Sequence, residues 1–239
     1  MHADKPLSGQ SAIVTGASRG IGFAIARRLG QMGARVALCA RGQQRLEAAS
    51  SKLRQAGIET LALPADVSRA AEVSAVAEAA AKSFGALDIL VNNAGIGRFA
   101  PVHEFSEADW DALLDTNLKG VFLMSRAVIP GMIARGRGHI INISSLAGKN
   151  FFAGGSVYCA SKWGLLGLTY SMAEDLRGYG IRVAAICPGS VATDFSPHPG
   201  KKMDKILQPE DVAHAVAMIL TEAPQSFISE VLLRPTKKP

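Results

Sequence analysis

The sequence has few cysteines and no spacing of residues that suggests a metal site. Its three cysteines are far apart, with no CxxC pair: Cys39, Cys159 and Cys187. Their odd number and spacing argue against a disulfide framework and against a zinc site, so we expect reduced, structural thiols. Three of the five histidines also share no metal-ligand spacing: His103, His139 and His198. No metal is predicted.

Long apolar runs are also missing. No stretch approaches the ~20 apolar residues that a membrane-spanning helix requires. Residues 1–10 are polar and contain no apolar core of a signal peptide. These absences predict a cytoplasmic protein that does not enter a membrane.

The chain has no long basic run, although it carries a formal net charge of +6. Its lysines and arginines are scattered and are not interleaved with aromatic residues. Nucleic-acid binding therefore has no support in the sequence, and an anionic small ligand fits the positive charge equally well. We predict a small-molecule ligand and no nucleic-acid partner.

Composition and apolar pattern together predict the fold. Hydrophobic residues make up 48% and charged residues 19% of the 239 positions, as in an ordinary globular protein. Between residues 11 and 189, short runs rich in Val, Ile and Leu alternate with longer amphipathic segments, which is typical of βαβ units. We predict an α/β fold with a single domain over residues 1–239, a Rossmann-type doubly wound parallel sheet of seven strands flanked by helices.

The boundaries of these elements follow from the same pattern. The expected strands cover residues 11–16, 35–40, 59–65, 87–92, 138–144 and 182–187, with a last strand near 228–234. The expected helices cover residues 20–32, 43–56, 69–84, 106–135 with a break near Pro130, 155–178 and 209–222. Residues 190–208 have the composition of a loop, with Pro197, Pro199 and Gly200, and we expect this loop to bind substrate.

A glycine-rich turn, TGASRGIG at residues 15–22, follows the first expected strand. Glycines let the backbone approach a pyrophosphate, which the free N–H groups of a helix N-terminus then bind. The spacing GxxxGxG differs from the usual dinucleotide fingerprint, and a similar turn occurs where a helix simply packs closely on a strand. Its place on the first βα turn of a doubly wound sheet favours a cofactor site.

The end of the second strand indicates which dinucleotide is bound. An NAD-specific site normally has an acidic residue there to hold the ribose 2′-hydroxyl, but residues 34–46 contain no Asp or Glu. Arg41 follows the strand instead, and with Arg19 it would neutralise a 2′-phosphate. The alternative is that both arginines are ordinary surface residues. The missing carboxylate favours NADP(H).

A second group of polar residues lies after the fifth strand and on the next helix. Ser145 follows the strand, and the motif YCASK places Tyr158 and Lys162 on one helix face. An ammonium near the phenol would bring the Tyr158 pKa from about 10 toward the working pH, as a general acid or base needs. Ser145 would hold the substrate oxygen. Each feature alone also occurs without function, because YxxxK arises by chance and serine is common at strand ends.

In this order the motifs resemble the short-chain dehydrogenase/reductase family over nearly the whole chain, in particular its NADP-dependent 3-oxoacyl-carrier-protein reductases. The residues that carry the resemblance are TGASRGIG at 15–22, Asp66-Val67, Asn92-Asn93-Ala94-Gly95, Asn117 in DTNLKG, Ser145, YCASK at 158–162, and Pro188-Gly189 followed by Thr193. The resemblance implies an enzyme that reduces a ketone or aldehyde to an alcohol by hydride transfer, with Tyr158 as proton donor. One implied substrate class is a 3-oxoacyl thioester.

The resemblance also implies the roles of individual residues. The catalytic set is Asn117, Ser145, Tyr158 and Lys162, in which Asn117 holds a water of the proton relay and Lys162 also binds the ribose hydroxyls. The implied NADP(H) contacts are Gly16, Ser18, Arg19, Ile21 and Gly22 for the pyrophosphate and adjoining groups, Arg41 for the 2′-phosphate, Asp66 and Val67 for adenine, Asn93 and Ala94 for the path to the nicotinamide ribose, Thr193 for the carboxamide, and further Gly95, Tyr158, Lys162, Pro188, Gly189 and Val191.

The C-terminal strand departs from the family pattern. Many members have a glycine-rich last strand, whereas this chain reads ISEVLLRPT at residues 228–236. The strand is still expected to form, but details of substrate and assembly do not transfer. Much of the circumference of the helix at 155–178 is apolar, which predicts a subunit interface in a homodimer or homotetramer. Its apolar residues are Val157, Trp163, Leu165, Leu166, Leu168, Tyr170 and Met172.

Three other functions stay open as alternatives. They are a catalytically silent dinucleotide-binding sensor, an NADP-dependent dehydrogenase of 3-hydroxy acids or sugar alcohols, and an isomerase or dehydratase with tightly held NAD. The complete catalytic set argues against the sensor, and the short segment after the sixth strand argues against the isomerase or dehydratase. Four further residues either line a substrate pocket or simply pack: Phe151, Phe152, Phe195 and His198.

Overall fold

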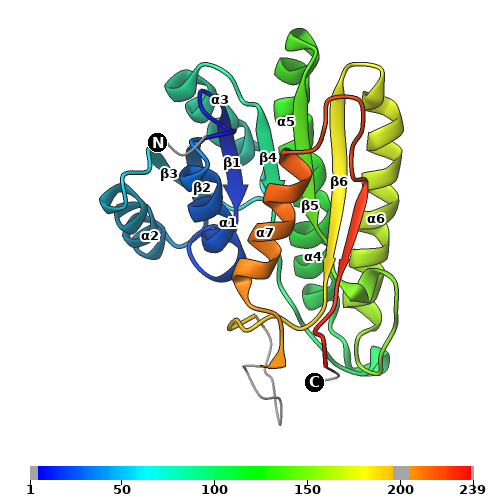
Figure 1. Cartoon of the computed structure of the whole chain (residues 1–239). Helices are drawn as coiled ribbons and strands as arrows, with labels where there is room; N and C mark the ends of the chain where they lie inside the picture. Colours follow the sequence, from blue (N-terminus) through cyan, green and yellow to red (C-terminus); the bar gives the residue numbers. More distant parts are fainter. Residues whose placement is uncertain (1–4, 196–204, 238–239) are drawn as a thin grey trace.

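The computed structural model describes residues 5–195 and 205–237. A seven-stranded sheet runs through them in the order β3-β2-β1-β4-β5-β6-β7, and every neighbouring pair of strands is parallel (Figure 1). The strands are β1 Ser11–Thr15, β2 Arg35–Ala40, β3 Thr60–Pro64, β4 Ile89–Asn92, β5 Gly138–Ile143, β6 Ile181–Pro188 and β7 Glu230–Leu233. The predicted Rossmann-type doubly wound sheet is confirmed.

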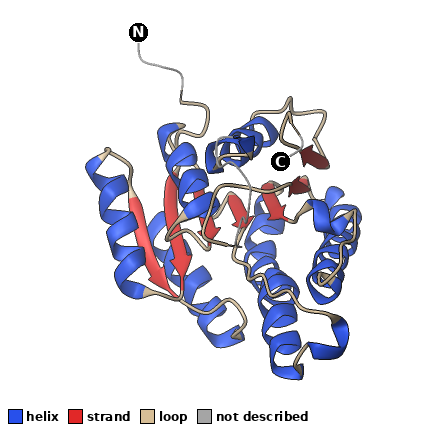
Figure 2. Cartoon of the chain, turned by 90° about the horizontal axis from the view of Figure 1, so that it is seen from below, coloured by secondary structure: helices blue, strands red, loops and turns tan. Residues whose placement is uncertain are grey.

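Helices cover both faces of the sheet, and Figure 2 shows the strands between them from below. α1, α2 and α7 pack on one face, and α3, α5 and α6 pack on the other. The helices are α1 Gly20–Gln31, α2 Gln43–Gln55, α3 Ala70–Phe84, α4 Glu107–Leu114, α5 Gly120–Arg135, α6 Ser156–Arg177 and α7 Pro209–Leu220, with the short segments η1 Val102–Glu104, η2 Asp115–Lys119 and η3 Leu146–Gly148.

The strands are rich in apolar residues because both faces of the sheet are covered. On β1, Ala12 and Val14 belong to the core under α1, α2 and α7, whereas Ile13 between them belongs to the opposite core. All three side chains are fully buried. Alternate residues of a strand point to opposite faces, so a strand buried on both sides reads as a continuous apolar run.

The long helix predicted before the fifth strand is divided at a different place. Pro130 lies inside α5, so the predicted break there is wrong. Pro130 is exposed, while Val128 and Met132 on either side of it are buried and keep α5 packed on the sheet. The discontinuity is instead the π-helical segment η2, which contains the buried Asn117.

The strand order places the ligand-binding crevice. β2 and β3 follow β1 on one side, while β4 to β7 lie on the other side. In doubly wound sheets, ligands bind outside the carboxyl ends of the strands where the order reverses in this way. The glycine-rich turn follows β1 and the segment Asn92-Asn93-Ala94-Gly95 begins at the end of β4, so both meet at this point.

Three features concern membrane helices, metal ligands and cysteines in the described residues. Within the described ranges, no helix is both long enough and apolar enough to cross a membrane. The same residues contain no group of three His, Cys, Asp or Glu placed to hold a metal ion. All three cysteines are free and buried, and burial raises the pKa of Cys39 to about 12, which leaves this thiol unreactive.

Candidate active site

A cavity of about 770 Å³ opens at the carboxyl ends of the strands. Its walls come from the turns after β1 to β6 and from the first turns of α6. The site residues predicted from the sequence all line this cavity, except Gly22 and Asn117. Residues that the sequence analysis did not single out also line it: Arg45, Ile96, Phe99, Thr116, Leu146, Asn150 and Asp194.

The glycine-rich turn is shaped for the close approach of a ligand. Gly16 has a φ of +66°, and a Cβ atom on it would lie 2.8 Å from Nδ2 of Asn93, so glycine is required there. The turn leads into the N-terminus of α1, whose first turn has no acidic residue, so its free N–H groups suit an anion. Gly22 faces the carbonyl oxygen of Gly16, so it packs α1 against the turn.

Hydrogen bonds hold the turn after β4 beside the glycine-rich turn. The Thr15 hydroxyl accepts from the backbone N–H groups of Asn93 and Ala94, each at 2.9 Å. The side-chain amide of Asn93 donates to the Thr15 carbonyl oxygen at 2.9 Å. The two walls on either side of the crevice are therefore fixed to each other.

Arginines line one end of the cavity, where β2 and β3 finish. Arg41 follows β2, and Arg45 lies on the first turn of α2. Burial raises the pKa of Asp66, but hydrogen bonds from Ser68 and the charge of Arg41 outweigh this effect and leave the pKa below its usual value. Arg45 was not predicted from the sequence, although its position four residues after Arg41 was a usable signal.

Arg19 differs from its expected arrangement. Its Nη1 donates to Oδ2 of Asp194 at 2.8 Å, and both side chains are more than half exposed at the mouth of the cavity. The pair links the glycine-rich turn to the start of the segment after β6. Arg19 thus lines the cavity as predicted, but it forms an ion pair with Asp194 that was not predicted.

Tyr158 and Ser145 meet at the other end of the cavity. Tyr158 is in the first turn of α6, which begins at Ser156, and only 7% of it is exposed. Burial raises its pKa to about 12, while a hydrogen bond with the Ser145 side chain acts in the opposite direction. The predicted hydroxyl pair is therefore assembled, with the phenol in its protonated form at neutral pH.

Lys162 lies one helical turn further on, and the structure gives it a different contact from the expected one. Its Nζ donates to the carbonyl oxygen of Ile143 at 3.0 Å and lies 5.9 Å from the centroid of the Tyr158 ring. Burial lowers the Lys162 pKa to about 8. Burial has the largest effect on the pKa of both groups, and Lys162 is not among the groups that shift the Tyr158 pKa in this arrangement.

Asn117 does not line the cavity, and it supports the cavity wall from behind. Its side chain accepts from the Ile96 N–H at 2.8 Å and donates to the Ile96 carbonyl at 3.0 Å and to the Ser161 hydroxyl at 3.2 Å. These bonds join the turn after β4 to α6. The amide therefore fixes the position of Ile96 beside α6.

Two aromatic rings contact Tyr158 and a third packs against one of them, and we call the three the phenylalanine wall: Phe99, Phe195 and Phe152. The ring of Phe99 meets Tyr158 edge-on at a centroid distance of 5.3 Å, and the ring of Phe195 lies at 6.0 Å. Of the residues left open by the sequence, Phe152 and Phe195 line the cavity, Phe151 is 91% exposed, and His198 lies outside the described residues.

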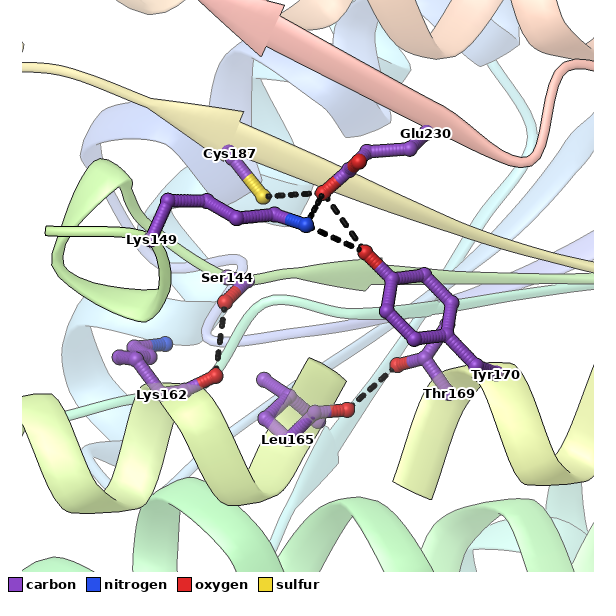
Figure 3. Close-up of polar contacts among 8 residues, drawn as sticks. All are labelled: Ser144, Lys149, Lys162, Leu165, Thr169, Tyr170, Cys187 and Glu230. Atoms are coloured by element: carbon purple, nitrogen blue, oxygen red, sulfur yellow. Dashed lines mark hydrogen bonds and ion pairs between the residues drawn. The ribbon is translucent and has the colours of Figure 1, made fainter. Parts of the chain in front are cut away.

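A polar network behind Ser145 was not expected from the sequence. Figure 3 shows Lys149, Tyr170 and Cys187 around the carboxylate of Glu230, the first residue of β7. Lys149 Nζ and the Tyr170 hydroxyl each lie 2.8 Å from Glu230 Oε1. Lys149 follows η3, Glu230 begins β7 and Tyr170 is on α6, so this network joins the turn that begins at Ser145 to β7 and α6. Glu230 belongs to the C-terminal strand, whose sequence departs from the family pattern.

Comparisons with known proteins agree with this geometry. A family model described as short chain dehydrogenase matches residues 10–204. A glycine betaine reductase of Emericella nidulans is 37% identical over 98% of this chain, which spans 19% of that protein's length. A metagenomic short-chain oxidoreductase in complex with NADP is 50% identical, with a TM-score of 0.87 over 98% of this chain and 100% of the other. A variant of the actinorhodin polyketide ketoreductase with NADPH is 34% identical, with a TM-score of 0.88 over 95% of this chain and 96% of the other.

Proposed function

Since this chain belongs to the short-chain dehydrogenase family and is an NADP-dependent oxidoreductase, we propose that it reduces a ketone or aldehyde to an alcohol, with Tyr158 as the proton donor. The observation that carries this proposal is that Ser145 and Tyr158 share one cavity with the glycine-rich turn and the N-terminus of α1, whose free N–H groups suit a pyrophosphate. The cofactor supplies the hydride, and the protein supplies orientation and the proton.

The cavity residues fit NADP(H) in particular. The backbone at Gly16 leaves room that a side chain would fill, and the N-terminus of α1 favours the negative pyrophosphate. Arg41 and Arg45 lie beyond β1, at the end of the cavity opposite Tyr158, where they would bind the 2′-phosphate. Lys162, whose Nζ lies close to the cavity wall, would bind the ribose hydroxyls.

The catalytic residues divide the proton chemistry among them. A reduction requires a neutral acid that gives a proton to the carbonyl oxygen, and burial keeps the Tyr158 phenol protonated. The Ser145 hydroxyl would orient that oxygen toward Tyr158. Asn117 would maintain a proton relay by holding Ile96 and α6 together. Lys162 would supply a positive charge that stabilises the Tyr158 phenolate formed in the reaction.

The segment at residues 190–208 is the proposed substrate loop. Its two described ends are joined, because Val191 and Leu207 form a parallel bridge and the Ala192 N–H donates to the Leu207 carbonyl at 2.8 Å. Ser190, Thr193 and Phe195 line the cavity. Pro197, His198, Pro199 and Gly200 lie outside the described residues.

Assembly and location complete the proposal. The protein would form a homodimer or homotetramer through α5 and α6, where Phe122 is 43% and Trp163 52% exposed. Other residues of the apolar set on α6 are buried within the subunit: Val157, Leu165, Leu166 and Met172. The cytoplasm is the proposed location, since free cysteines are typical of a reducing compartment.

The function is tested by following NADPH absorbance with a panel of ketones, aldehydes and 3-oxoacyl thioesters. The native protein should oxidise NADPH with at least one carbonyl compound. Tyr158→Phe should keep NADPH binding, measured by fluorescence, and lose ~10² to 10⁴ in turnover, because the ring remains but the transferable proton does not. Near-normal turnover in a folded Tyr158→Phe variant, or no oxidation with any carbonyl, would contradict the proposal.

A further inference from the structure

The phenylalanine wall leaves apolar surface exposed at the reacting end of the cavity. Phe99 is 41%, Phe152 47% and Phe195 41% exposed, whereas Tyr158, which contacts Phe99 and Phe195, is 7% exposed. The three rings come from the turns after β4, after η3 and after β6. Apolar area in a concave site favours an apolar ligand that removes it from water.

The wall is built into the backbone. A Cβ atom on Gly97 would lie 2.8 Å from Cε1 of Phe195 and 3.0 Å from Cζ of Phe99, so both rings rest directly against the main chain there. The rings of Phe99 and Phe152 are 5.9 Å apart between centroids. The wall thus extends from Phe195 and Phe99, which both contact Tyr158, to Phe152.

Charged side chains near the wall already have partners. Among the described residues, Arg98 pairs with Asp109 at 3.0 Å, and Arg19 pairs with Asp194 at 2.8 Å. Lys149 pairs with Glu230 at 2.8 Å, and Lys162 donates to the Ile143 carbonyl. Arg41 and Arg45 are at the opposite end, after β2 and on α2.

We infer that the substrate is an uncharged, apolar carbonyl compound, of which an aryl ketone is the simplest representative; this inference rests on the proposed reductase function. A flat ring would stack on the phenylalanine wall and bring its carbonyl to Ser145 and Tyr158. A carboxylate or phosphate would lose its hydration, and the cations near the wall within residues 5–195 and 205–237 already have partners. The structure therefore favours neutral ketones over 3-hydroxy acids as the substrate class.

The first experiment compares matched substrates on the native protein. Acetophenone and 4-acetylbenzoate present the same aryl ketone without and with a carboxylate. We expect kcat/KM for acetophenone to exceed that for 4-acetylbenzoate, and also that for dihydroxyacetone, by at least about tenfold, as for a charged group that loses a hydrogen bond. Equal values, or a preference for either polar ketone, would overturn the inference.

The second experiment introduces a cation into the wall. Phe152→Arg should raise the ratio of kcat/KM for 4-acetylbenzoate to that for acetophenone by about tenfold, because a charged hydrogen bond becomes available. Phe151→Arg is the matched control, since Phe151 is the adjacent residue, is 91% exposed and does not line the cavity. A general loss of folding would lower kcat/KM for both substrates by the same factor and leave the ratio unchanged. An unchanged ratio in a Phe152→Arg protein that is shown to be folded therefore counts against the inference. The native comparison decides if that variant does not fold.

A binding measurement separates this inference from the proposed function. Saturation-transfer NMR with NADP⁺ present would detect acetophenone and 4-acetylbenzoate without any turnover. Binding of acetophenone alone, weakened by Phe152→Arg but not by Phe151→Arg, with no NADPH oxidation by any carbonyl, would support the wall and refute the reductase. Turnover restricted to anionic or small polar carbonyls would support the reductase and refute the wall.

Discussion

Reversing the charge of Arg41 should reverse the coenzyme preference. Arg41 stands after β2, where an acidic residue would bind the ribose 2′-hydroxyl of NADH, and its charge already lowers the pKa of the nearby Asp66. In Arg41→Asp, the new carboxylate would repel the 2′-phosphate of NADPH and accept a hydrogen bond from the 2′-hydroxyl of NADH. The two effects act in opposite directions on the two coenzymes.

The size of the change follows from one charged hydrogen bond. Such a bond contributes about 1.5 to 3 kcal/mol, so its loss should lower kcat/KM with NADPH by roughly tenfold to a hundredfold. Arg45 remains on α2 and should keep the loss near the lower value. Arg41→Asp together with Arg45→Ala should therefore lose more than either single variant.

The assay is kcat/KM for both coenzymes at one ionic strength, because exposed charges are screened by salt. Arg28→Asp is the control, since Arg28 is an exposed arginine of α1 that does not line the cavity, and its replacement changes the net charge equally. If the native protein already prefers NADH, or if Arg28→Asp moves the ratio as much as Arg41→Asp, Arg41 does not read the 2′-phosphate.

Three other predictions concern catalysis, stability and assembly. Lys162→Ala should weaken NADPH binding and lower turnover, because Lys162 has two proposed tasks; unchanged NADPH affinity by fluorescence titration would remove the ribose contact. Burial and the charge of Arg182 lower the pKa of His139 to about 4, below its unfolded value of 6.5. Because the unfolded state then binds the proton more readily than the folded state, up to about 3 kcal/mol of the stability present above pH 6.5 should be lost as the pH falls toward 4. Urea unfolding of the native protein and of His139→Gln across this range should show the steeper loss in the native protein alone. Sedimentation at micromolar concentration should show a dimer or tetramer, whereas a species of only 25.1 kDa would contradict the interface on α5 and α6.

Local sequence patterns predicted most of the fold. Apolar runs such as residues 12–14 predicted buried strands because both faces of the sheet are covered, and the motif spacing placed Ser145 and Tyr158 at one edge. Pro130 misled the prediction because a proline interrupts a helix in isolation, whereas burial of the residues on either side keeps α5 intact.

Features that join distant segments could not be predicted in this way. The phenylalanine wall needs three rings from three turns, and a single phenylalanine carries no sign of the other two. Lys149 finds its carboxylate partner at Glu230, and Arg19 finds its partner at Asp194. Each contact depends on which distant segments of the chain the fold brings together, and local sequence patterns do not predict this.

The π-helical segment Asp115–Lys119 changes what counts as a disruptive mutation in this region. A π turn contains one residue more than the corresponding α turn, so it is equivalent to an insertion inside a helix. Deleting one residue would restore regular α geometry and rotate the preceding helix by about 100° relative to α5, since each residue accounts for that angle. Asn117 would then lose its hydrogen bonds to Ile96 and Ser161, even though no other residue had been replaced. This stretch should accept exchanges at the exposed Lys119 far better than any change in its length.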